Sequence, residues 1–137
     1  MLIIRNAIVN TISGEAIENG FVAVNDGKIL KTGGMPVPEE LLKGAELLDA
    51  KGMQLYPGFI DAHSHLGMWE DGVGFEGSDG NESVDPVTPE MRAIDAINPM
   101  DRTFEEARAG GITATATGPG SANVIGGQFA VIKTWGI

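Results

Sequence analysis

The order of segments after Pro57 is the sequence feature that most limits the possible folds. Residues 58–63 read as a buried strand, residues 101–109 have helical character, and residues 112–117 alternate β-branched residues with alanine. Two strands joined by a long connection that contains a helix pair in parallel. The segment therefore predicts a βαβ unit, and with it a parallel sheet or barrel.

The helix within this segment carries signals at both of its ends. Asp101 is suited to cap its first turn, and Glu105 and Glu106 place negative charge near its amino end. Gly110-Gly111 is expected to end it. Residues 129–135 predict one more strand after the βαβ unit.

Residues 1–56 predict a small all-β unit made of short strands. Asp26-Gly27 between two apolar runs indicates a type I′ hairpin. Residues 38–43 predict one helical turn ended by Gly44, and we expect the last two strands to pair with each other around Lys51-Gly52. The expected strands are residues 2–9, 21–24, 28–30, 46–49 and 53–56.

Composition narrows the possible functions. The chain has 137 residues, 42% of them hydrophobic, which is typical of a globular protein. It has no cysteine, which excludes disulfides, thiolate-bound zinc and a thiol nucleophile. A net charge of −10 disfavours nucleic acid and membrane surfaces as partners. With no signal peptide pattern and no apolar run of about 20 residues, we expect a cytoplasmic protein.

His63 and His65 are the candidate metal ligands. They are the two histidines of the chain, and on a strand residues i and i+2 point to the same face. Imidazole is the commonest protein ligand for transition metals. The pair therefore predicts half of a metal site, although two ordinary histidines are the simpler alternative. Asp61 shares their face and is either a support for the ligands or a hydrogen-bonding residue at the strand end.

Other residues allow a functional and a structural interpretation. Gly118-Pro119-Gly120 and Gly126-Gly127 could cradle an anion, but turn geometry explains them equally well. Lys133 is a weak candidate for a modified metal-binding lysine, and Trp69 and Trp135 suit packing. The acidic loop of residues 67–90 is either a substrate loop, a solvated surface, or a source of carboxylate ligands beside the two histidines. Its acidic candidates are Glu70, Asp71, Glu76, Asp79, Glu82 and Asp85.

Residues 55–67, Leu-Tyr-Pro-Gly-Phe-Ile-Asp-Ala-His-Ser-His-Leu-Gly, resemble the signature of the amidohydrolase superfamily. Residues 107–113 resemble the first barrel helix entering the second strand, and residues 119–128 resemble a loop of its imidazolonepropionase-like branch. The resemblance implies an α/β chain. Residues 1–56 would be the N-terminal part of a β-sandwich domain, and residues 57–137 the first strands and helix of an incomplete (β/α)8 TIM barrel.

The resemblance also implies a function. His63 and His65 would be the first two ligands of a divalent metal, zinc or alternatively iron or manganese, and Asp61 would support them. The activity would be hydrolysis of C–N bonds in a small-molecule substrate, such as a cyclic amide or amidine, by a metal-activated water. The remaining ligands and the catalytic aspartate come later in such proteins. The resemblance therefore implies an N-terminal fragment that holds no catalytic residue and is inactive alone.

The βαβ unit itself leaves a different possibility open. One such unit can neither close a parallel sheet nor cover both of its faces. Exposed apolar strands promote association, so we expect a homo-oligomer. The alternative to an enzyme segment is a self-associating or metal-binding fragment without catalysis.

Overall fold

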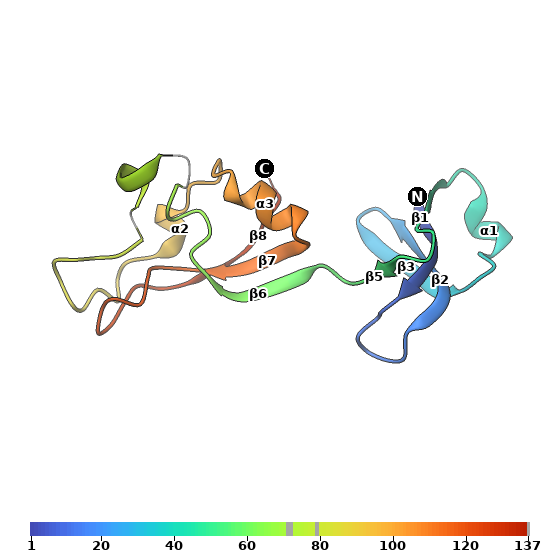
Figure 1. Ribbon diagram of the computed structural model, residues 1–137, viewed down its shortest axis with the longest axis horizontal. Helices are drawn as coiled ribbons and strands as arrows, with labels where there is room; N and C mark the ends of the chain where they lie inside the picture. Colours follow the sequence, from blue (N-terminus) through green and yellow to red (C-terminus); the bar gives the residue numbers. More distant parts are fainter. Residues whose placement is uncertain (71–72, 79, 137) are drawn as a thin grey trace. The chain divides into compact units, whose positions relative to one another are not determined.

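The computed structural model describes residues 1–70, 73–78 and 80–136, and it divides into two compact units (Figure 1). The first unit is Met1–Pro57 and the second is Gly58–Ile137. The chain thus divides one residue after the expected boundary between residues 56 and 57.

The first unit is a mixed sheet built around its first strand. Strand β1 pairs antiparallel with β2 and parallel with both β4 and β5, and the strand order is β3-β2-β1-β4 with β5 beside β1. A β-sandwich requires two packed sheets. The described residues of this unit form a single sheet, so they do not make a complete sandwich. The strands are β1 (Leu2–Val9), β2 (Ile17–Asn25), β3 (Lys28–Gly34), β4 (Glu46–Asp49) and β5 (Gln54–Leu55).

A bulge in β1 moves its later side chains to the opposite face of a sheet that is buried on both faces. Asn6 has φ of 54°, and the pairing of β1 with β2 shifts register on both sides of Ala7. An extra residue in a strand exchanges the faces to which the following side chains point. Ile3 accordingly packs in one buried cluster with Phe21, while Ala7 and Val9 lie in a second cluster.

The predicted hairpin and helical turn of this unit are confirmed. Asp26 and Gly27 have φ of 49° and 72°, the left-handed values that a type I′ turn between β2 and β3 requires. Helix α1 (Glu39–Leu42) is one turn long, and Gly44 follows it with φ of 71°.

The predicted pairing of residues 46–49 with 53–56 is wrong. Strands β4 and β5 instead lie one after the other along the same edge of β1, because β1 is long enough to pair with both. Lys51 and Gly52 adopt φ of 51° and 79° between them, and the Gly52 N–H donates to the Asn6 carbonyl at 2.7 Å. The turn therefore fits over the bulge in β1.

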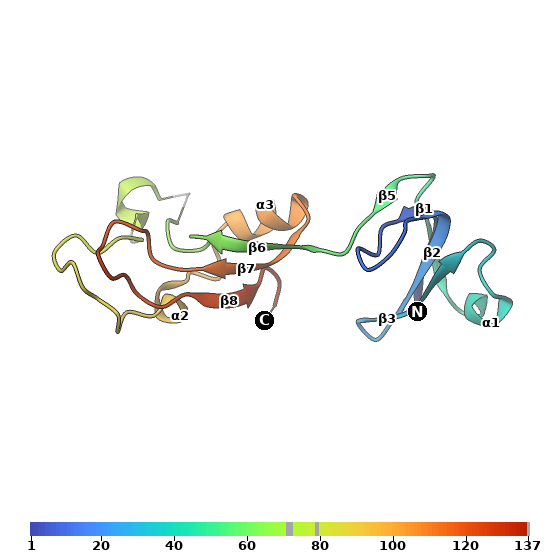
Figure 2. The same ribbon diagram turned by 90° about the horizontal axis from the view of Figure 1, so that it is seen from below.

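The second unit contains the predicted βαβ arrangement. Strands β6 (Phe59–Ser64) and β7 (Ile112–Thr117) pair in parallel, and helix α3 (Thr103–Ala109) packs against β7 on one face of the sheet (Figures 1 and 2). Strand β8 (Ala130–Lys133) pairs antiparallel with β7. All eight strands of a TIM barrel are parallel. The antiparallel pairing of β8 with β7 therefore differs from the strand order expected for the start of such a barrel. The chain consists of mixed sheets with few helices.

The ends of α3 follow the sequence prediction. The Asp101 carboxylate accepts hydrogen bonds from the backbone N–H and the hydroxyl of Thr103, both at 2.8 Å. Gly110 ends the helix and Gly111 has φ of 86°. None of the described helices is long and apolar enough to span a membrane.

The prediction that residues 58–63 form a buried strand is wrong for this chain. The side chains of Phe59 and Ile60 are 51% and 72% exposed. Strand β6 pairs on one side with β7 and is at the edge of the three-stranded sheet, so it is not the interior strand that the apolar run predicted.

Two short elements were not predicted. The 3-10 turn η1 (Gly74–Gly77) lies within the expected loop of residues 67–90, and helix α2 (Ala93–Ala96) lies after that loop, where no element was predicted; each spans four residues. Four residues are too few to show a helical period, so tertiary contacts decide their conformation.

Candidate metal centre

The parallel pairing of β6 and β7 places both candidate ligands at the carboxyl ends of the strands. Ser64 pairs with Thr117, the last residue of β7. His63 lies just before this position and His65 just after it. The carboxyl edge of a parallel sheet is where α/β proteins bind ligands, so the histidines occupy the edge expected for a site.

The His65 ring is orientated by the backbone that follows β7. Its Nδ1 lies 2.6 Å from the Gly118 carbonyl oxygen. A carbonyl oxygen only accepts hydrogen bonds, so Nδ1 carries the proton in this contact. In the neutral ring Nε2 then holds the lone pair. This is the arrangement that metal-ligating histidines use, in which one nitrogen is fixed by a backbone carbonyl and the other is available to the metal.

The two imidazoles lie side by side. The centroids of the His63 and His65 rings are 5.4 Å apart, with their planes at 84°. The Phe129 ring contacts both, with its centroid 5.1 Å from that of His63 and 6.4 Å from that of His65. The centroids of the Trp69 and His65 rings are 6.2 Å apart. The sequence brings the two histidines together, but only the fold adds the aromatic wall.

A buried polar layer holds the backbone on both sides of His65. Thr115 and Thr117 are 1% and 0% exposed. The Ser64 and Thr115 hydroxyls are hydrogen bonded at 2.7 Å, and the Thr117 hydroxyl donates to the Leu66 carbonyl at 2.8 Å. Sequence reasoning missed these residues. The sequence signal that could have found them is the threonine at every second position of β7. The same alternation is also expected of a strand with one exposed face.

The Asp61 carboxylate turns to the backbone of its own strand. Its Oδ1 accepts a hydrogen bond from the His63 N–H at 3.1 Å. This contact is of the strand-end type, and it fixes the backbone of a candidate ligand rather than an imidazole nitrogen.

The described carboxylates of the acidic loop mainly accept hydrogen bonds from backbone N–H groups of the same loop. Glu82 Oε1 accepts the N–H groups of Val84 and Asp85, at 2.5 Å and 3.3 Å, and the Glu70 carboxylate accepts from the Asn98 side chain at 2.9 Å. Asp71 and Asp79 lie outside the described residues. Among the residues that are described, no group of three or more metal-binding side chains comes together. The site thus presents two imidazoles, whereas a zinc site takes three or four protein ligands.

The glycine motifs make close contacts between loops. A side chain at position 118 would overlap the Phe129 ring, and one at position 127 would overlap the Met91 carbonyl. The Gly120 N–H donates to the Gly80 carbonyl at 2.6 Å. These contacts explain the glycines by packing, the structural one of the two interpretations.

The last two candidates lie in or after β8. Lys133 is exposed and pairs with Ala114 in the sheet. Trp135 is 71% exposed and stacks with the Arg108 guanidinium, whose central carbon is 4.8 Å from the ring centroid.

Comparison with known proteins gives relatives for the whole chain. It is 38% identical over 115 residues, 83% of its length, to amidohydrolase tasK of Hapsidospora irregularis. It is 46% identical over 52 residues to an imidazolonepropionase of Thermoanaerobacter pseudethanolicus. An amidohydrolase structure from Thermotoga maritima MSB8 matches 100% of the chain, with a TM-score of 0.87 and 45% identity. The resemblance to the amidohydrolase superfamily is confirmed.

The similarity covers a part of each amidohydrolase relative. The chain spans 12% of the tasK amidohydrolase, 12% of the imidazolonepropionase and 34% of the Thermotoga maritima amidohydrolase. No protein-family model matches the chain.

Gly118 provides a test of this geometry. We expect Gly118→Ala to lower the free energy of unfolding of the second unit by about 1–3 kcal/mol, because the added methyl group overlaps Phe129. The two tryptophans of the chain, Trp69 and Trp135, both lie in this unit and report its unfolding in urea by fluorescence.

Gly14→Ala is the matched control. No atom lies within 4 Å of a Cβ at position 14, so its effect on stability should stay within about 0.5 kcal/mol. If Gly118→Ala were as stable as Gly14→Ala, the close contact between residue 118 and Phe129 would be disproved.

Proposed function

We propose that this chain contributes two ligands, His63 and His65, to the metal centre of a hydrolase that acts on C–N bonds. The observation that carries the proposal is the bond from His65 Nδ1 to the Gly118 carbonyl, beside a second imidazole 5.4 Å away. The names of the relatives, amidohydrolase, imidazolonepropionase and adenine deaminase, support the same reaction class.

The residues present fit part of a zinc site, with iron or manganese as alternatives. A divalent metal held there supplies Lewis acidity and lowers the pKa of a bound water to about 7. The chain's own residues orient the ligands: the Gly118 carbonyl holds the His65 ring, and Asp61 holds the His63 backbone. The further ligands and the catalytic base are expected in the rest of the protein.

Metal titration tests this proposal. We expect the chain to bind zinc by isothermal titration calorimetry. His63→Ala and His65→Ala should each lower the affinity by more than the roughly 10–100-fold that the loss of a supporting group costs. In a protein that contains this segment, the same variants should abolish turnover of a cyclic amide or amidine. Unchanged zinc affinity and turnover in either variant would contradict the proposal.

Asp61→Asn separates the two interpretations of the aspartate. Asparagine still offers an oxygen to the His63 N–H but carries no charge. A loss of zinc affinity of about tenfold would make the carboxylate a support of the ligands, and an unchanged affinity would make it a strand-end residue.

A second candidate function, self-association, is favoured by the exposed apolar side chains of the second sheet. Ile60 in edge strand β6 and Val131 in edge strand β8 are 72% and 79% exposed. Unprotected apolar edges promote pairing between chains. Light scattering with size-exclusion chromatography tests this: oligomers are expected, and a well-folded monomer would argue against self-association.

A further inference from the structure

The two imidazoles differ in what holds them. His65 is anchored by the hydrogen bond from its Nδ1 to the Gly118 carbonyl. His63 is exposed, and within the part of the chain that the structure describes its ring has no hydrogen-bond partner and contacts two other rings. One is His65, and the other is Phe129, whose ring centroid lies 5.1 Å from that of His63. Among the described residues, the His63 ring is therefore held by packing alone.

Phe129 is placed beside the imidazoles by the register of the last two strands. Thr117, the last residue of β7, pairs with Ala130, the first residue of β8. In an antiparallel pair the register continues in opposite directions along the two strands, which brings Phe129 opposite Gly118. One ring thus lies against both imidazoles and beside the peptide that anchors His65.

Gly118 makes room for this ring. Its backbone is not in the left-handed region, so the local conformation does not require glycine. A Cβ at position 118 would instead overlap Cδ2 and Cγ of the Phe129 ring. The absence of a side chain therefore allows the close approach of the ring to the backbone.

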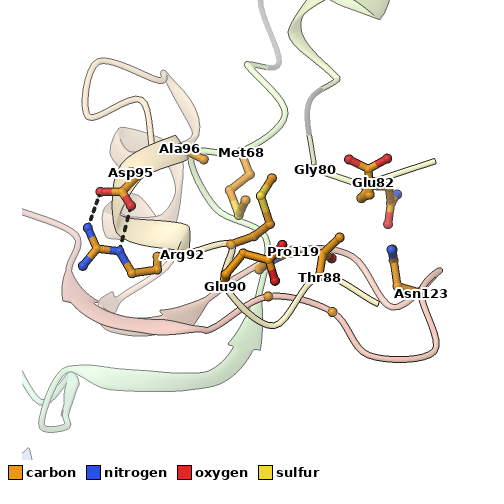
Figure 3. A pocket seen from close by; sticks show the side chains of 14 residues that line it. Met68, Gly80, Glu82, Thr88, Glu90, Arg92, Asp95, Ala96, Pro119 and Asn123 are labelled. Atoms are coloured by element: carbon orange, nitrogen blue, oxygen red, sulfur yellow. Dashed lines mark hydrogen bonds and ion pairs between the residues drawn. The ribbon is translucent and has the colours of Figure 1, made fainter. Parts of the chain in front are cut away.

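The backbone on the other side of Phe129 is fixed by the loop that precedes it. This loop lines one wall of a cavity of about 320 Å³ between α2 and residues 80–92 (Figure 3). The Gln128 N–H donates to the Met91 carbonyl at 2.7 Å, and the Gln128 side-chain amide donates to the Pro89 carbonyl at 2.9 Å. Phe129 thus follows a residue that is hydrogen bonded to a distant segment and precedes a paired strand, as a positioning residue requires.

Core packing does not account for the position of Phe129. Its side chain is 42% exposed, whereas Phe104 on helix α3 is 7% exposed. The ring contacts that Phe129 makes are with His63 and His65. Its contribution is therefore expected at the imidazoles rather than in the interior of the unit.

We propose that Phe129 is the positioning residue of His63, and that its ring keeps the His63 imidazole beside His65 in place of a hydrogen bond. The inference rests on the proposed function, because an imidazole that is already held loses less side-chain freedom when it binds a metal. Immobilising one such side chain on binding lowers an affinity roughly 2–10-fold. The contact between the two rings exists without metal and can be measured without it.

Calorimetric titration of Phe129 variants with zinc is the first test. Phe129→Leu keeps an apolar side chain but removes the flat ring, and we expect it to lower zinc affinity roughly 2–10-fold. Phe129→Tyr keeps the ring and should retain the affinity. Phe75→Leu is the matched control, because Phe75 is 90% exposed in the same unit and should not affect zinc. Equal zinc affinity in Phe129→Leu and Phe75→Leu would overturn the positioning role.

The side-chain rotamer of His63, measured by NMR without metal, separates this inference from the metal proposal. Three-bond couplings should show one χ1 rotamer of His63 in the natural chain and in Phe129→Tyr, and averaged rotamers in Phe129→Leu. The couplings of His65 should stay unchanged, because its hydrogen bond to Gly118 remains. Circular dichroism and the urea midpoint show whether Phe129→Leu retains the fold, which is expected because Phe129 is partly exposed.

The two proposals can fail independently. Averaged His63 rotamers in the natural chain, or a single rotamer that Phe129→Leu leaves unchanged, would overturn the positioning role whether or not zinc binds. A Phe129-dependent rotamer in a chain that binds no zinc would support the positioning of His63 and contradict the metal proposal alone.

Discussion

The parallel pairing of β6 with β7 is the constraint on which the candidate site depends. It brings Ser64 opposite Thr117, so that the segments leaving the two strands start at the same edge. His65 then reaches the Gly118 carbonyl, and the Thr117 hydroxyl reaches the Leu66 carbonyl. Polar groups buried at such a junction must be paired, and their pairing here fixes the ring of a candidate ligand.

The sequence predicted the features that depend on local pattern. The hairpin at Asp26-Gly27, the ends of α3 and the strand that carries the histidines all follow from neighbouring residues. Features set by distant partners were missed or wrong. The placement of β4 and β5 depends on the bulge at Asn6, the exposure of Ile60 depends on what covers β6, and α2 is too short to show a period.

The same limit explains why the cavity between α2 and the loops of the second unit could not be predicted. Its walls come from loops that pair through backbone groups, such as Thr88 with Ile125, and backbone groups carry no sequence signal. The ion pair of Arg92 with Asp95 in its wall is likewise an ordinary pair three residues apart on the surface.

The tautomer of His65 is the most direct test of the central claim that the fold prepares this ring for a metal. Long-range proton–nitrogen correlation NMR at alkaline pH, without metal, distinguishes the two ring nitrogens of a neutral imidazole. The bond to Gly118 predicts the proton on Nδ1 and the lone pair on Nε2. A ring protonated on Nε2 would contradict the account, because the contact with the Gly118 carbonyl could then not be a hydrogen bond.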